Sequence, residues 1–163
     1  MDQQRHRSAP TRPQLDVWRD YIETADVLRS RLGARLLSES SLSSGDYQVL
    51  LALSEASGHT LRSSELATRI RWERSRLSHH LGRMENRELI RRVACADDVH
   101  GVDVVLTDVG LASFRNGSVP HLRAVKELFV DALSDDQLTA LEDIVAALRR
   151  HLRLDDHRPG QTA

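Results

Sequence analysis

Residues 61–107 read LRSSELATRIRWERSRLSHHLGRMENRELIRRVACADDVHGVDVVLT, and this stretch decides the fold. Apolar residues at three- and four-residue steps predict one helix from Ser63 to about Ile70 and another from about Glu73 to Arg87. A tight break separates the two helices near Arg71 and Trp72. Four residues fall on one side of the second helix: Leu77, Leu81, Met84 and Glu88.

The next residues predict a β-hairpin. Two segments rich in β-branched residues, 89–96 and 102–107, flank the turn-forming cluster Asp97-Asp98-Val99-His100-Gly101. A brief extended stretch is expected before the first helix, at 59–61. Two short helices, a tight turn and a hairpin are the elements of a winged helix-turn-helix, in which the second helix enters the DNA major groove and the hairpin acts as a wing.

Amphipathic helices are predicted on both sides of this unit. The first runs over about 15–38, and Ser43 with Asp46 forms a capping-box pattern that starts a second helix ending near Ala56. Thr107 is expected to cap a long helix that reaches about Leu133. A second capping box, Ser134-Asp135-Asp136-Gln137, starts the last helix. The predicted fold is mainly α-helical with a small β-wing.

The domain layout follows from these elements. Residues 1–13 are expected to form a disordered leader, 14–154 a single domain, and 155–163 a frayed tail. Within the domain, the winged helix is expected at about 44–107 and the dimerisation helices at about 15–38 and 108–153. In the last helix, apolar residues recur at steps of three and four, which predicts either a seam that pairs with another helix or packing on the protein's own core. These residues are Leu138, Leu141, Val145, Leu148 and Leu152.

Composition excludes several classes of protein. The 163 residues are 40% hydrophobic, enough for the core of one domain. No apolar run reaches the roughly 18 residues that span a bilayer, and the first residues lack the apolar core of a secretory signal. A cytoplasmic protein without a membrane partner is therefore expected. The single cysteine, Cys95, excludes an intramolecular disulfide within the chain.

The net charge of −1 hides an uneven distribution. Residues 62–92 carry nine arginines against four acidic residues, a local charge of +5. Residues 93–163 carry seven basic against twelve acidic residues, a local charge of −5. A basic middle segment in an otherwise acidic chain indicates an element that binds a polyanion.

The face of the second helix opposite its apolar side presents polar groups. At 100° per residue, Ser75, Arg76, His79, Gly82 and Arg83 point away from the core. Arg76 and Arg83 lie about two turns apart, roughly 10 Å along the axis, a spacing suited to a groove-inserted helix. An ordinary solvated face is the alternative, but the adjacent wing favours DNA. The predicted DNA-binding residues are Arg62, Ser63, Arg74, Ser75, Arg76, Ser78, His79, Arg83, Arg91, Arg92, Asp98, His100 and Gly101.

Several strings together resemble the MarR (multiple antibiotic resistance regulator) family of transcriptional regulators over about Leu15 to Leu152. Residues 61–67 look like its first helix-turn-helix helix, and 72–81 look like its recognition helix. Asp98-Val99-His100-Gly101 occupies the place of its wing-tip Asp-x-Arg-Gly motif, and 106–110 match its Leu-Thr-x-x-Gly exit from the wing. The resemblance implies an obligate homodimer that binds a pseudo-palindromic operator and usually represses nearby genes.

The resemblance also implies an interface and an effector. The N- and C-terminal helices would form the dimer, with Trp18 and the apolar residues of the last helix at the interface. A small-molecule effector would release the DNA, although the sequence names no ligand. His100 stands where the family usually has arginine, so we expect weaker wing binding, or binding that strengthens as the pH falls through the histidine range.

Other sites have less support. Aromatic and acidic groups could line an effector cleft, although core positions are the favoured reading for them: Trp18, Tyr21, Asp46, Tyr47 and Trp72. Cys95 is interpreted as a small buried hydrophobe rather than a redox sensor.

No metal site or cofactor is expected. Cys95, Asp98, His100 and Asp103 would sit in a wing without fixed geometry, and the adjacent His79 and His80 diverge on a helix. Catalytic motifs are absent from the sequence, so an enzyme is not expected. The runner-up function is a winged-helix protein-interaction module with weak or no DNA binding.

Overall fold

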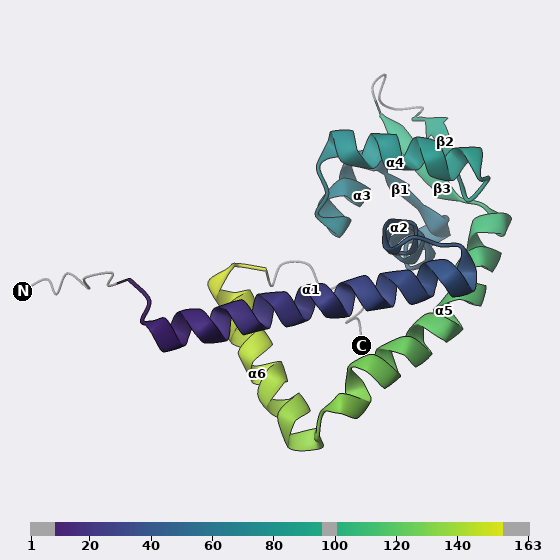
Figure 1. The fold of residues 1–163 in the computed structure, drawn as a ribbon. Coiled ribbons are helices and arrows are strands. Elements are labelled where there is room, and N and C mark those ends of the chain that lie inside the picture. The colour runs from purple at the N-terminus through teal and green to yellow at the C-terminus, as the bar shows by residue number, and fades with distance from the viewer. Residues whose placement is uncertain (1–8, 96–100, 155–163) are drawn as a thin grey trace, which may run out of the picture.

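The computed structural model describes residues 9–95 and 101–154. The chain folds into a small lobe attached to a frame of long helices (Figure 1). The frame contains α1 (Arg12–Ser40), α5 (Asp108–Leu128), the 3-10 turn η2 (Val130–Ala132) and α6 (Asp135–His151). The lobe contains all the described elements between α1 and α5.

The lobe has the winged helix-turn-helix order. Its elements are α2 (Ser44–Ser54), η1 (Ser57–His59), β1 (Thr60–Arg62), α3 (Ser63–Ile70), α4 (Arg74–Asn86), β2 (Ile90–Ala94) and β3 (Val102–Leu106). The strands form one antiparallel sheet in the order β1-β3-β2. Leu61 pairs with Val104, and Ile90 pairs with Leu106. The fold class predicted from the sequence is confirmed.

One apolar core holds the lobe together. The fully buried side chains come from all three of its helices and from the sheet, and α4 supplies Leu77, Leu81 and Met84 as its spacing predicts. Each such side chain contributes roughly 1.5–3 kcal/mol relative to an exposed one. The largest of the fully buried set are Leu42, Leu50, Leu53, Leu66, Leu77, Leu81, Met84 and Ile90.

The predicted local signals match the structure closely. Ser43 and Ser134 both cap their helices through capping boxes, with Asp46 and Gln137 as the third helical residues. The tight break between α3 and α4 is a left-handed residue, Arg71, with φ 58°, followed by a bond from the Trp72 N–H to the Ala67 carbonyl at 2.9 Å. These features depend on short spacings along the chain, which is why the sequence reveals them.

Three expectations need correction. The first helix begins at Arg12 rather than near Leu15, because Pro13 occupies its first turn, where its missing N–H leaves no bond unmade. The long helix ends at Leu128, where Phe129 leaves helical geometry and a 3-10 turn follows. The brief extended stretch expected at 59–61 is confirmed as strand β1, which joins the predicted hairpin as a third strand. Glu88 lies beyond α4, exposed at φ 60°, and does not continue its apolar side.

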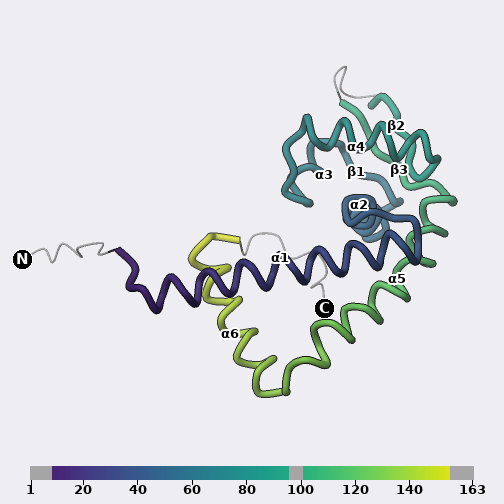
Figure 2. The backbone as a smooth tube through the Cα atoms, in the orientation of Figure 1, coloured from purple at the N-terminus to yellow at the C-terminus, as the bar shows by residue number. Residues whose placement is uncertain are grey.

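The frame leaves much apolar surface uncovered. Leu36 is the one fully buried residue of α1, and α6 has none among the residues described. Figure 2 shows α5 leading from the lobe down to α6, which lies away from the lobe. A groove of about 560 Å³ runs between α1 and the α5–α6 junction, lined by side chains that include Tyr21, Leu28, Phe129 and Leu141. The predicted apolar seam of α6 is therefore not explained by the chain's own core.

The junction between the wing and α5 is closely packed at Gly110. The Thr107 hydroxyl caps the helix by accepting from the Gly110 N–H at 2.9 Å and donates to the Glu88 carbonyl at 2.6 Å. A Cβ at Gly110 would lie 1.9 Å from the Leu89 carbonyl oxygen, a backbone atom that cannot turn aside. The Leu-Thr-x-x-Gly spacing thus has a steric reason.

Gly110→Ala is expected to destabilise the fold by about 1–3 kcal/mol, because the methyl group forces the strand and helix apart. Gly82→Ala is the matched control, since nothing lies within 4 Å of a Cβ there. Alanine in that open helical position should stabilise by about 0.5–1 kcal/mol. Urea denaturation of both variants measures the difference. Equal stabilities would contradict the steric reading.

Candidate DNA-binding surface

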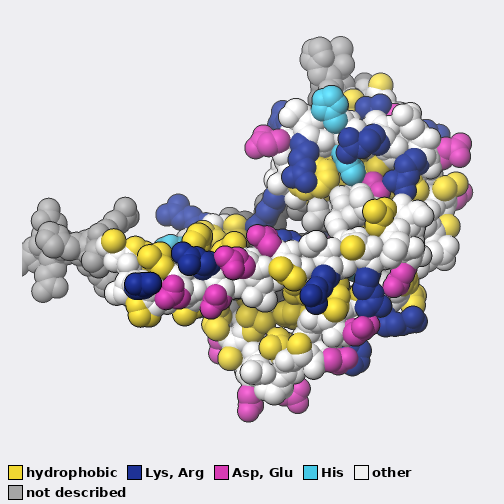
Figure 3. Space-filling model, in the orientation of Figure 1, with side chains coloured by type: hydrophobic (Ala, Val, Ile, Leu, Met, Phe, Trp, Pro, Cys, Tyr) yellow, Lys and Arg dark blue, Asp and Glu magenta, His cyan; other side chains and the backbone are white. Residues whose placement is uncertain are grey.

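The exposed face of α4 carries the predicted recognition residues. Ser75, Arg76, His79 and Arg83 lie on the side opposite the buried leucines, and all four are exposed. Figure 3 shows arginine and histidine side chains gathered over the lobe that holds α3 and α4. Along α1, by contrast, basic and acidic side chains are interspersed with apolar ones. The basic segment 62–92 therefore forms a basic surface on the folded lobe.

Two of these arginines are held by neighbours. The guanidinium carbon of Arg76 lies 4.1 Å from the centre of the Trp72 ring, a cation–π contact. The Nη2 atom of Arg83 lies 2.9 Å from Nδ1 of His80. Trp72 and His80 in turn meet edge to face, with ring centroids 5.1 Å apart. Both arginines therefore rest on one aromatic pair.

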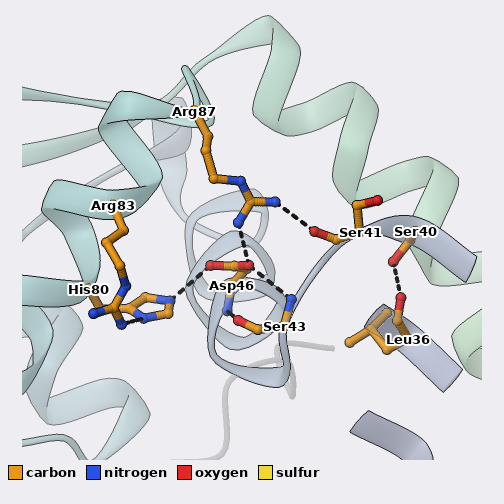
Figure 4. Close-up of polar contacts among 8 residues, drawn as sticks. All are labelled: Leu36, Ser40, Ser41, Ser43, Asp46, His80, Arg83 and Arg87. Carbon is orange, nitrogen blue, oxygen red and sulfur yellow. Dashed lines mark hydrogen bonds and ion pairs between the residues drawn. The ribbon is translucent and has the colours of Figure 1, made fainter. Parts of the chain in front are cut away.

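Beneath this pair lies a buried carboxylate, Asp46, in the first turn of α2 (Figure 4). Its Oδ1 lies 3.0 Å from His80 Nε2, and its Oδ2 accepts from the Ser43 N–H at 2.9 Å and from Arg87 Nη1 at 2.8 Å. The other end of the Arg87 guanidinium donates to the Ser41 carbonyl at 2.6 Å, where α1 ends. One carboxylate thus joins α1, α2 and α4.

These contacts decide the charge of Asp46. Burial alone would raise the pKa of the carboxyl, because it disfavours the charged form. The hydrogen bonds from His80, Ser43 and Arg87 outweigh burial and hold the pKa of Asp46 well below its ordinary value. Asp46 is therefore ionised in the folded protein at neutral pH.

The remaining predicted DNA contacts lie on α4 itself and on the neighbouring elements β2 and α3. Arg74 and Ser78 are exposed on α4, and Arg91 is exposed on β2. Arg92 is paired with Glu85, whose carboxylate accepts from its Nε at 2.8 Å; this bond lowers the pKa of Glu85. Ser63 opens α3, half-buried.

Arg62 and Gly101 lie at the base of the wing. The Nη2 atom of Arg62 donates to Cys95 Sγ at 2.9 Å, and the Gly101 carbonyl accepts from the Cys95 N–H at 2.9 Å. Cys95 is half-buried rather than fully buried. Asp98 and His100 lie outside the described residues.

The candidate effector-cleft residues have different surroundings in the structure. Trp18 and Tyr21 are 61% and 53% exposed, so the core positions favoured for them are wrong for the single chain. Tyr47 packs against Phe114 and His121, at centroid distances of 5.3 and 4.6 Å, and burial lowers the pKa of His121. Trp72 and Asp46 belong to the contacts beneath α4 described above.

Solved structures share this fold over nearly the whole chain. AbsC, a MarR family transcriptional regulator from Streptomyces coelicolor, is 36% identical, with a TM-score of 0.81 over 90% of this chain and 98% of that one. The chain belongs to the MarR family. Sco3205, a second MarR family regulator from Streptomyces coelicolor, was solved in complex with DNA and is 31% identical, with a TM-score of 0.82 over 96% and 95% of the two chains.

More distant structures show the same fold. An organohalide sensing transcriptional regulator in its 2,4-dichlorophenol bound form is 21% identical, with a TM-score of 0.78 over 97% of this chain and 98% of that one. No protein-family model and no curated protein matches the chain. AbsC, Sco3205 and the organohalide sensor are transcription regulators, not enzymes.

Sequence reasoning misses the residues beneath the MarR recognition helix. It treats His80 only as a neighbour of His79 that cannot share a metal with it, and it gives Arg87 no role. The spacing Leu77, His80, Leu81, Met84 places His80 on the apolar side of α4, where a polar residue needs a partner. That signal is present, but nothing in the sequence indicates that the partner is Asp46, 34 positions earlier. Among the residues the structure describes, no group of three His, Cys, Asp or Glu side chains could hold a metal.

Asp46→Asn tests the role of the buried charge. Because the pKa of Asp46 is lower in the folded than in the unfolded state, its stabilisation is complete above about pH 4 and is lost as the pH falls below that value. The asparagine variant should be less stable at pH 7 by about 1.5–3 kcal/mol, and its stability should fall less steeply between about pH 5 and pH 2. Denaturant unfolding at each pH measures this, with Asp143→Asn on the exposed side of α6 as the control. Parallel pH profiles for wild type and Asp46→Asn would contradict it.

Proposed function

We propose that this MarR family member is a homodimeric transcriptional regulator that binds a pseudo-palindromic duplex through α4. The observation that carries the proposal is the outward polar face of α4, with Arg76 and Arg83 on it, in a segment of charge +5. A recognition helix in the major groove uses such side chains for base edges and phosphates. The relative Sco3205, solved in complex with DNA, supports this use of the fold.

The proposed contacts divide by position. Ser75, Arg76, His79 and Arg83 would face the groove, and Arg74 and Ser78 would flank them. The DNA backbone would be approached by Arg62, the last residue of β1, and by Ser63, the first residue of α3. The wing contacts would come from Arg91, Arg92, Asp98, His100 and Gly101. Since Arg92 is already paired with Glu85, its contribution requires exchanging that partner for a phosphate. We therefore rank Arg91 above Arg92 as a backbone contact.

The exposed apolar surface of the frame supports a dimer of the N- and C-terminal helices. Val145, Leu148 and Leu152 are 39%, 43% and 60% exposed, and Trp18 is exposed on α1. Exposed apolar surface of this extent on a monomer marks an interaction site. Two-fold pairing would place two α4 helices about one DNA turn apart, roughly 34–36 Å. The proposed layout keeps the winged helix at about 44–107 and the dimerisation helices at about 15–38 and 108–153.

We also propose a small-molecule effector, a role as a repressor and a cytoplasmic location. The dichlorophenol-bound relative supports a small aromatic effector that releases DNA, without identifying one for this chain. No described helix is long and apolar enough to cross a membrane. A regulator of chromosomal genes acts in the cytoplasm, and the site described needs no catalytic chemistry.

Arg76→Ala is expected to weaken binding to a selected operator by about 1–3 kcal/mol. Selection from a random duplex pool should first yield a palindrome of about 16–20 base pairs for the wild type. Fluorescence anisotropy then compares Arg76→Ala with Arg123→Ala, which removes the same charge from an exposed position on α5. Affinity should also fall steeply with salt concentration. A folded dimer that selects no duplex at low salt would favour the protein-interaction alternative.

Leu148→Glu is expected to convert the dimer to a monomer, because the carboxylate would be desolvated in the proposed interface. Thr139→Glu is the control, since it places the same group on the opposite side of α6. Light scattering of both variants gives the mass in solution. A dimer that survives Leu148→Glu would move the interface away from α6.

A further inference from the structure

His80 is a polar side chain at a core position of α4. It is 8% exposed, and its neighbours on the same side of the helix are the fully buried Leu77 and Leu81. Buried polar groups are retained where they make specific hydrogen bonds, since an unmade bond is unfavourable. Both ring nitrogens of His80 lie close to a polar partner: Nδ1 is 2.9 Å from Arg83 Nη2, and Nε2 is 3.0 Å from Asp46 Oδ1 (Figure 4).

The two partners determine which nitrogen carries the proton. A guanidinium only donates hydrogen bonds, so Nδ1 of His80, 2.9 Å from Arg83 Nη2, must act as the acceptor. A neutral ring that accepts at Nδ1 carries its hydrogen on Nε2, which faces Asp46 Oδ1 at 3.0 Å. This hydrogen is therefore on the nitrogen that lies nearest the carboxylate. The ring is thus a relay with a fixed direction, from Arg83 through His80 to Asp46.

The ring also has little freedom to move. The Trp72 ring contacts it edge to face. On another side, a Cβ at Gly45 would lie 2.9 Å from His80 Cε1 and 2.8 Å from Trp72 Cη2, so the backbone of α2 approaches both rings closely. Asp46 is itself fixed by the Ser43 N–H and by Arg87. A fixed acceptor therefore faces an arginine on the outward side of α4.

We propose that His80 is a positioning residue for DNA recognition, which anchors one nitrogen of the Arg83 guanidinium and leaves its other donors directed at the groove. The proposal rests on the DNA-binding function proposed above, and His80 itself touches no DNA. An arginine that is ordered before binding loses less side-chain freedom in the complex, an advantage of about threefold to tenfold in affinity. Orientation also narrows the set of bases that Arg83 can contact.

The test compares variants of His80 with and without Arg83 on the selected operator. His80→Leu removes the acceptor, and we expect binding to weaken by about threefold to tenfold. His80→Gln keeps one acceptor and one donor, and should restore most of the lost affinity. In a double-mutant cycle, His80→Leu should have little further effect once Arg83 is alanine, because its effect passes through that side chain. His151→Gln, an exposed histidine on α6, should match the wild type.

The base preference at each operator position is a second measurement, which a general loss of stability would leave unchanged. Repeated selection with His80→Leu and with Arg83→Ala should flatten the preference at the same operator position and leave other positions unchanged. Additive losses in the cycle, flattening at a different position, or a glutamine variant as weak as leucine in a folded protein would overturn the proposal.

A measurement on the free protein separates this proposal from the DNA-binding function. Nitrogen-15 NMR of the His80 ring should show the Nε2–H tautomer in the wild type and an altered Nδ1 signal in Arg83→Ala. A wild type that binds no duplex would overturn the function and the role of His80 with it, even with that tautomer present. A wild type that binds its operator but carries the proton on Nδ1 would overturn the role of His80 alone.

Discussion

The Asp46 carboxylate is the contact on which the position of α4 depends. Burying a charge is strongly unfavourable unless hydrogen bonds replace the lost water. Asp46 meets this condition with groups from three places: the Ser43 N–H at the start of its own helix, His80 on α4, and Arg87 just beyond α4. Since Arg87 also reaches the Ser41 carbonyl, the end of α1 is tied to the same point. No apolar contact would fix the three helices with comparable directionality.

The lobe is attached to the frame at a second place, where the wing leads into α5. There Thr107 bonds to the carbonyls of Glu88 and Leu89, and Gly110 allows helix and strand to approach. The two attachments lie where the chain enters and leaves the lobe, one at the α1–α2 junction and the other at the β3–α5 junction. A shift between α1 and α5 would therefore have to rearrange bonds at Asp46 or strain the packing at Gly110. The recognition helix is thus mechanically connected to the frame that forms the proposed dimer.

The sequence predicts the parts of this arrangement that depend on short spacings. Capping boxes at Ser43 and Ser134, the buried side of α4 and its outward face all follow from residues within a few turns of one another. The third strand and the contacts of Asp46 with His80 and Arg87 depend on side chains and strands brought together by folding. For His80, the spacing along α4 predicts that the side chain is buried. It does not predict the partner, Asp46, which lies on α2.

Because the charges are segregated, DNA attracts one part of the molecule and repels the other. The segment 62–92 carries +5 and lies in the lobe, whereas 93–163 carries −5 and supplies the last two helices of the frame. A polyanion attracts the first and repels the second, so the field orients the molecule before any specific contact forms. A near-neutral total is compatible with this, because orientation depends on the separation of charges and not on their sum. In the proposed complex, Arg76 and Arg83, already held by Trp72 and His80, would need little further ordering, and base recognition would depend on the geometry set beneath them by Asp46.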